Sequence, residues 1–177
     1  MSAESGPRGP ERQLGPLEGL AALAADAARR GDTETLAQAI AAGLSAGATT
    51  PRGDSLLMLA AYHEQIGAVR LLLASGADPN QRDAKGQTPL AGVAFKGLVE
   101  IAQVLVSAGG DVDARAADGR TPLGMAAAFN RTTMVQWLLD HGASRDLRDA
   151  SGARPIDMAR ALGATDAAAL LDEQAAI

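Results

Sequence analysis

Residues 86–94 read Gly-Gln-Thr-Pro-Leu-Ala-Gly-Val-Ala, and residues 119–127, 33 positions further along, read Gly-Arg-Thr-Pro-Leu-Gly-Met-Ala-Ala. In each stretch the threonine can cap a helix, because its hydroxyl accepts from a free backbone N–H. The proline that follows loses no hydrogen bond at the first helical position. Each stretch therefore predicts a short apolar helix. We expect these helices to end near Gly97 and Asn130, since both residue types tolerate the left-handed conformation of a C-cap.

The same spacing extends over most of the chain. A second apolar segment follows each first helix, at residues 99–106 and 133–139, and a polar, Asp-rich stretch leads into the next copy. Two independent glycine series share the period of 33 residues: Gly53, Gly86, Gly119 and Gly152, and Gly43, Gly76, Gly109 and Gly142. A fixed period of this length predicts a stacked array of turn and helix-pair units.

The repeated motifs resemble the ankyrin repeat family. They are Thr88-Pro89-Leu90, Thr121-Pro122-Leu123 and Gly76-Ala77-Asp78, and the resemblance covers residues 17–171. It implies an all-α solenoid of about five helix–turn–helix repeats, at 17–47, 48–80, 81–113, 114–146 and 147–177, of which the first and last are caps. The family's histidine after the leucine is replaced by Met58, Ala91, Gly124 and Asp157. The missing hydrogen bonds should cost some stability without changing the fold.

The repeat predicts which apolar residues form the core. We expect Ala60, Ala61, Val93, Ala94, Ala126, Ala127 and Ala159 to pack between repeats. In the second helices we expect Leu71, Leu72, Leu73, Val104, Leu105, Val106, Trp137, Leu138 and Leu139 to be buried.

Composition limits the function. The formal net charge is -5 and the pI is about 5.0, so binding to nucleic acid or to an anionic membrane is not expected. Cysteine is absent, which excludes disulfides and thiolate metal sites. Residues 1–16 are rich in Gly, Pro, Glu and Arg and lack the apolar segment of a secretion signal, so we expect a disordered leader ahead of a domain at 17–177. A cytoplasmic monomer is the expected form.

No group of residues predicts catalysis. The two histidines, His63 and His141, are 78 positions apart and fall in different repeats. His141 precedes Gly142, where it can face a helix C-terminus. The acid pairs Asp111/Asp113 and Asp146/Asp149 lie in turns, where carboxylates commonly bond their own backbone. No phosphate-binding glycine motif occurs. We therefore expect no catalytic, cofactor or metal site, and no enzyme activity.

The family resemblance implies that a partner binds the turn tips and the inner face of the first helices. Three of the four aromatic residues fall in those helix positions, either as exposed anchors or as fillers between alanine-rich repeats. Basic residues surround them and favour a partner segment with acidic and apolar side chains. The expected partner-binding residues are Tyr62, His63, Arg82, Lys85, Gln87, Phe95, Lys96, Arg115, Arg120 and Phe129.

The expected function is a non-enzymatic protein-binding adaptor or scaffold. The alternative is a regulator or inhibitor that blocks one enzyme or toxin through the same groove, which the sequence does not separate from an adaptor. Residues 128–143 in particular are similar to small bacterial ankyrin repeat proteins, some of which are encoded near catalases and linked to oxidative stress. This resemblance would imply a role in that response.

Overall fold

The computed structural model describes residues 16–173, and in that range the chain forms five consecutive helix pairs. The helices are α1 (Pro16–Arg30), α2 (Thr33–Ala41), α3 (Leu56–Tyr62), α4 (Ile66–Ala74), α5 (Pro89–Lys96), α6 (Val99–Ser107), α7 (Pro122–Ala128), α8 (Thr132–Asp140), α9 (Pro155–Ala161) and α10 (Thr165–Glu173). One isolated antiparallel bridge joins Thr49 and Ser55. The all-α repeat architecture predicted from the sequence is confirmed. Helix α1 begins at Pro16, one residue before the predicted domain start, and the rest of the expected leader lies outside the described residues.

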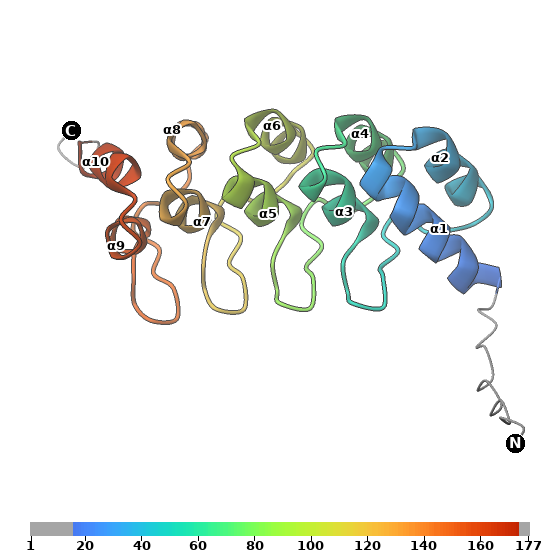
Figure 1. Cartoon of the computed structure of the whole chain (residues 1–177), viewed down its shortest axis with the longest axis horizontal. Coiled ribbons are helices and arrows are strands. Elements are labelled where there is room, and N and C mark those ends of the chain that lie inside the picture. The colour runs from blue at the N-terminus through green and yellow to red at the C-terminus, as the bar shows by residue number, and fades with distance from the viewer. Residues whose placement is uncertain (1–15, 174–177) are drawn as a thin grey trace, which may run out of the picture.

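The pairs stack side by side into an elongated row (Figure 1). Helices α3, α5, α7 and α9 form one layer, and α4, α6, α8 and α10 form a second layer above it in the view of Figure 1. The loops that precede the first helices project away from the second layer (Figure 1). Each first helix contacts the first helix of the next pair, so the array is stabilised by neighbouring units.

The helix starts follow the predicted capping chemistry. The Ser55 hydroxyl accepts from the Met58 N–H at 3.1 Å, and the Thr121 hydroxyl accepts from the Gly124 N–H at 3.1 Å. Helix α5 ends at Gly97, which has φ 83°, and Asn130 has φ 54° just after α7. Both predicted helix ends are therefore confirmed.

The core prediction holds for the first helices and is partly wrong for the second. All seven residues expected between repeats are buried. In the second helices only the central residue of each triplet, Leu72, Leu105 or Leu138, is fully buried. The flanking residues are half-buried: Leu71, Leu73, Val104, Val106, Trp137 and Leu139. The reason is that a helix in the outer layer packs on the first helices along one face and meets water along the other.

Candidate partner-binding groove

A pocket of about 420 Å³ lies where the projecting loops meet the first helices. We call it the α3–α5 pocket; it is lined by Asp54, Met58, Leu59, Tyr62, Asp83, Lys85, Gln87, Thr88, Gly92, Phe95 and Met125. Its helix side is mainly apolar, and its loop side carries the charged groups. Four of the predicted partner-binding residues line it, namely Tyr62, Lys85, Gln87 and Phe95.

The aromatic residues at the groove differ in exposure. Tyr62 is 44% exposed and Phe129 is 42% exposed, whereas Phe95 is half-buried. The Phe95 and Phe129 rings meet edge to face, with centroids 4.4 Å apart and an interplanar angle of 78°. Such a contact contributes about 0.5–1.5 kcal/mol beyond area burial. Phe95 thus fills space between repeats, while Tyr62 and Phe129 keep apolar area free for a partner.

Lys96 is held against Tyr62. Its ammonium nitrogen lies 5.0 Å from the Tyr62 ring centroid and donates to the Tyr62 carbonyl at 2.8 Å. It also forms an ion pair of 2.7 Å with Glu64. Because its charge is already paired, Lys96 orients the tyrosine more than it attracts an acidic partner.

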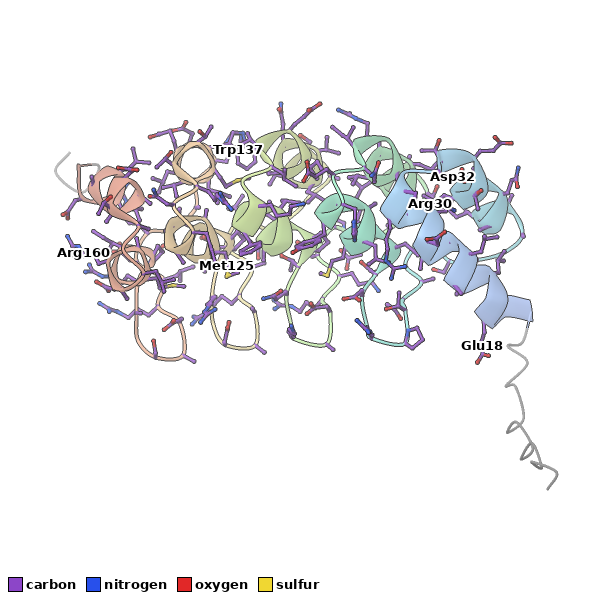
Figure 2. All side chains as sticks on the ribbon, viewed as in Figure 1. Glu18, Arg30, Asp32, Met125, Trp137 and Arg160 are labelled. Atoms are coloured by element: carbon purple, nitrogen blue, oxygen red, sulfur yellow. The ribbon has the colours of Figure 1, made fainter. Side chains whose placement is uncertain are left out.

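The two histidines lie at helix ends. His63 is the C-cap of α3, is exposed, and has its ring centroid 5.9 Å from that of Tyr62, outside the α3–α5 pocket. His141 is the C-cap of α8, and its Nδ1 lies 2.7 Å from the Trp137 carbonyl oxygen, as a residue facing a helix C-terminus should. Its ring stacks on Trp137 with centroids 3.9 Å apart. Figure 2 shows Trp137 at the edge of the molecule opposite the loops, while Met125 lies on α7 nearer the loops.

Arginines brace the loops to one another. Arg82 donates to the Arg115 carbonyl, and Arg115 donates to the Arg148 carbonyl, each one repeat further along. Arg82 and Arg148 also donate to the carbonyls of Gly86 and Gly152 in their own loops, at 2.9 and 2.8 Å. A carbonyl does not neutralise a guanidinium, so the braces hold the loops in place and keep the positive charge. The sequence indicated the charge of these residues but not this bracing.

The loop tips are positive although the chain is acidic. Loops 51–54, 82–87, 115–120 and 148–152 together hold six basic and four acidic side chains, a net of +2 against -5 for the whole chain. Arg120 forms a 3.3 Å ion pair with Asp118. Within residues 16–173, Lys85 has no ion pair within 4.0 Å, so its charge is available to a partner.

The carboxylates at the loops have two different environments. Asp83 Oδ1 accepts from the N–H groups of Lys85 and Gln87, both at 2.8 Å. Asp149 accepts from Ser151 and Ala153 in the equivalent loop, and the Ser151 hydroxyl above all lowers the pKa of its carboxyl. Asp54 lines the α3–α5 pocket, is half-buried, and has no hydrogen bond to its carboxylate among the described residues. The predicted partner-binding residues include neither Asp54 nor Asp83, because the prediction rested on the aromatic and basic residues at the groove.

Two of the four turn carboxylates, Asp111 and Asp149, bond the backbone of their own turns as the sequence predicts. Asp111 accepts from the Asp113 N–H at 2.9 Å, and Asp113 accepts from the Ser144 N–H at 2.9 Å in the next repeat. Asp149 bonds its own loop, as described above. Within the described residues there is no cluster of three or more acidic, histidine or cysteine residues that could hold a metal ion.

A second hollow, of about 510 Å³, opens on the outer layer between α4 and α6. Its lining includes Arg70, Leu73, Glu100 and Val104, and it contains none of the predicted partner-binding residues. Among the described residues, no helix has both the length and the apolar character that crossing a bilayer requires.

Comparison with models of known protein families gives a match over most of the chain. The sequence model described as ankyrin repeats (three copies) matches residues 24–116 and again residues 93–176. No curated protein matches the chain significantly.

Proposed function

Because this chain belongs to the ankyrin repeat family, a family of protein-binding modules, we propose that it is a non-catalytic adaptor that binds a protein partner through the α3–α5 pocket and the adjoining loop tips. The observation that carries the proposal is the combination of a partly apolar pocket with a net-positive loop edge in an acidic chain. Concave apolar sites with a few polar groups are where proteins usually bind ligands.

The charge of the loop edge favours a partner segment with acidic residues beside apolar ones. Lys85 and the bracing Arg82 and Arg115 would attract the acidic side chains. Complementary charge mainly speeds association and excludes wrong partners. Tyr62 and Phe129 offer exposed aromatic area for the apolar side chains.

The bracing of the loops supports the same proposal. Each loop is fixed by a carboxylate or hydroxyl that accepts from its own N–H groups. Arg82 and Arg115 also tie loops 82–87 and 115–120 to the loop that follows each of them. A surface that is ordered before binding loses less conformational entropy on binding. The loop edge is therefore suited to recognition by a largely preformed surface.

The test begins with capture of partners from the native host and identification by mass spectrometry. Association with the purified partner is then measured for the wild type, for Lys85→Glu and for Arg70→Glu. Both variants change the charge by the same amount, but Arg70 lines the outer hollow between α4 and α6. We expect Lys85→Glu to slow association about tenfold at low salt and less at high salt, with Arg70→Glu close to wild type. Equal effects of the two variants would contradict the proposed surface.

The same purified pair separates the adaptor from the alternative. An adaptor leaves the partner's own activity unchanged, whereas a regulator or inhibitor of an enzyme or toxin abolishes it at saturation. A cytoplasmic location and a monomeric state remain predictions from the sequence, and a link to catalases and oxidative stress remains a prediction from the family resemblance. Expression with and without peroxide tests the last of these.

A further inference from the structure

One missing side chain opens the α3–α5 pocket. Gly92 lies in α5 at a position that recurs every 33 residues, and the other repeats place Leu59, Met125 and Met158 there. Leu59 and Met125 also line the pocket. The third repeat is thus the only one of these four that has no side chain at this position.

Neither the backbone nor the packing around Gly92 requires a glycine. Its φ lies outside the left-handed region, and an added Cβ would meet only Tyr62 Cδ2, at an ordinary contact distance of 3.7 Å. Gly124 differs, because a Cβ there would lie 3.1 Å from Met158 Sδ. A glycine inside a helix costs about 1 kcal/mol relative to alanine. At Gly92 neither the backbone conformation nor the packing accounts for this cost, and the structural feature that depends on the glycine is the open pocket.

The pocket has an apolar side and, at Asp54, one carboxylate available to accept a hydrogen bond. Met58, Leu59, Phe95 and Met125 supply apolar surface. Asp54 is half-buried, and within residues 16–173 its carboxylate accepts no hydrogen bond. A group that covers Asp54 without donating to it would leave a desolvated charge, which is strongly unfavourable. A well-matched occupant therefore has an apolar body with a hydrogen-bond donor at its end.

We propose that the α3–α5 pocket receives a tyrosine side chain of the protein partner, whose ring packs on Met58, Phe95 and Met125 and whose hydroxyl donates to Asp54. This inference rests on the proposed function and specifies which side chain of the partner is recognised. Tyrosine combines an apolar ring with a donor hydroxyl and loses little conformational entropy on binding.

The surrounding charge selects tyrosine over the cationic alternatives. Arginine and lysine also have apolar stems and donors. However, Lys85 lines the same pocket, and the second lining carboxylate, Asp83, already accepts from two backbone N–H groups. Loops 51–54 and 82–87 together hold three basic and two acidic side chains, so the charge around Asp54 opposes the entry of a cation. Phenylalanine fits the apolar side but leaves Asp54 without a donor. A neutral donor satisfies both requirements.

The test uses the full chain, labelled with ¹⁵N, and three tripeptide probes: acetyl-Gly-Tyr-Gly-amide and its Phe and Arg counterparts. Amide shifts of the pocket residues are followed during titration. We expect the Tyr probe to bind with a Kd on the order of 1 mM and to perturb Gly92 and the loop at Asp54. The Phe probe should bind about tenfold more weakly, because a hydrogen bond to a charged group is worth at least that factor. The Arg probe should also bind more weakly, because the loops around the pocket are net positive.

Two variants test the pocket without endangering the fold. Gly92→Met restores the residue type of the neighbouring repeats, so it should keep or raise the melting temperature. The added side chain fills the pocket, so the Kd of the Tyr probe should rise at least tenfold. Asp54→Ala should make the Tyr and Phe probes bind about equally. Gly67→Met, in α4 outside the pocket, is the matched control and should bind the Tyr probe as the wild type does; an added Cβ there meets only Thr33, at 3.6 Å.

The outcomes separate this inference from the proposed function. Wild-type binding of the Tyr probe by folded Gly92→Met, or binding of the Phe or Arg probe as tight as the Tyr probe, would overturn the tyrosine pocket. Replacing the flanking glycines of the Tyr probe by glutamates should tighten binding at low salt. If it does not, the acidic preference of the proposed function is wrong, although the pocket still stands. If no probe perturbs the pocket, the inference fails, while partner capture still tests the proposed function.

Discussion

Substitution of Gly119 by alanine should measure how tightly the loops are stacked. Gly119 has φ 78°, in the left-handed region, and a Cβ added there would lie 2.9 Å from Ala150 N and 3.0 Å from Asp149 Cα. Both atoms belong to the backbone of the next loop. That loop is tied to this one by a 2.8 Å hydrogen bond from the Ala150 N–H to the Asp118 carbonyl. The new methyl group therefore cannot be accommodated by rotation of a side chain.

The expected cost has two parts. Alanine in the left-handed conformation costs about 1–2 kcal/mol. Separating the loops weakens the bond from Ala150 to Asp118, which costs about a further 1 kcal/mol. Gly119→Ala should therefore lower the free energy of unfolding by about 2–3 kcal/mol. Gly152 provides the matched control, since its φ is 86° and an added Cβ meets nothing within 4 Å. Gly152→Ala should lose only about 1–2 kcal/mol, the backbone part.

Urea denaturation of both variants, followed by circular dichroism and by Trp137 fluorescence, gives the two free energies. Agreement between the probes is required, because long repeat arrays can unfold in stages. Gly86→Ala should resemble Gly119→Ala, because its added Cβ would lie 2.8 Å from Ala117 N. Equal losses for Gly119→Ala and Gly152→Ala would refute the argument that contact between loops adds to the backbone strain.

Two further predictions concern stability. Trp137 is half-buried, so Trp137→Ala should lower the free energy of unfolding by about 2 kcal/mol, which is less than the loss of about 3–5 kcal/mol expected for a fully buried tryptophan. The fluorescence emission maximum of the folded protein should lie between those of buried and exposed indole. An emission maximum typical of fully exposed indole would contradict this placement. The Ser151 hydroxyl and then the N–H groups of Ala153 and Ser151 lower the pKa of the Asp149 carboxyl. Its contribution to stability is therefore fully present above its unfolded pKa of about 3.9 and is lost as the pH falls through the lower folded value. The free energy of unfolding of Asp149→Asn, measured by urea denaturation, should consequently fall less than that of the wild type as the pH is lowered from 5 through the folded pKa of Asp149. An unchanged pH dependence of the free energy of unfolding would count against this role.

The array could be predicted because its causes are local and recur. Thr88 and Thr121 cap the helices that follow them, and Gly97 and Asn130 end those helices, as the motif predicts. Each of these features depends on residues within a few positions of one another, so the sequence is sufficient to locate it. The period of 33 residues then predicts that similar units stack.

The candidate site was predictable only in part. The sequence placed Tyr62, Lys85 and Phe95 at the groove, because each occupies a repeat position on a first helix or loop tip. It left open whether the aromatics are anchors or fillers, and the structure shows both roles: Tyr62 is exposed, and Phe95 packs on Phe129. That distinction depends on the neighbouring repeat, which a motif within one repeat does not specify.

The sequence by itself determined the helix boundaries, the number of repeats, the alanine core between first helices and the net charge. The tertiary structure decided which side of each second helix is buried, how Arg82 and Arg115 brace the next loops, and that Gly92 opens a pocket beside Asp54. The physical reason is the range of the interactions. Caps, turns and apolar periodicity act within one repeat, whereas bracing, burial and pockets arise between side chains about 33 residues apart, whose contacts exist only once the units have stacked.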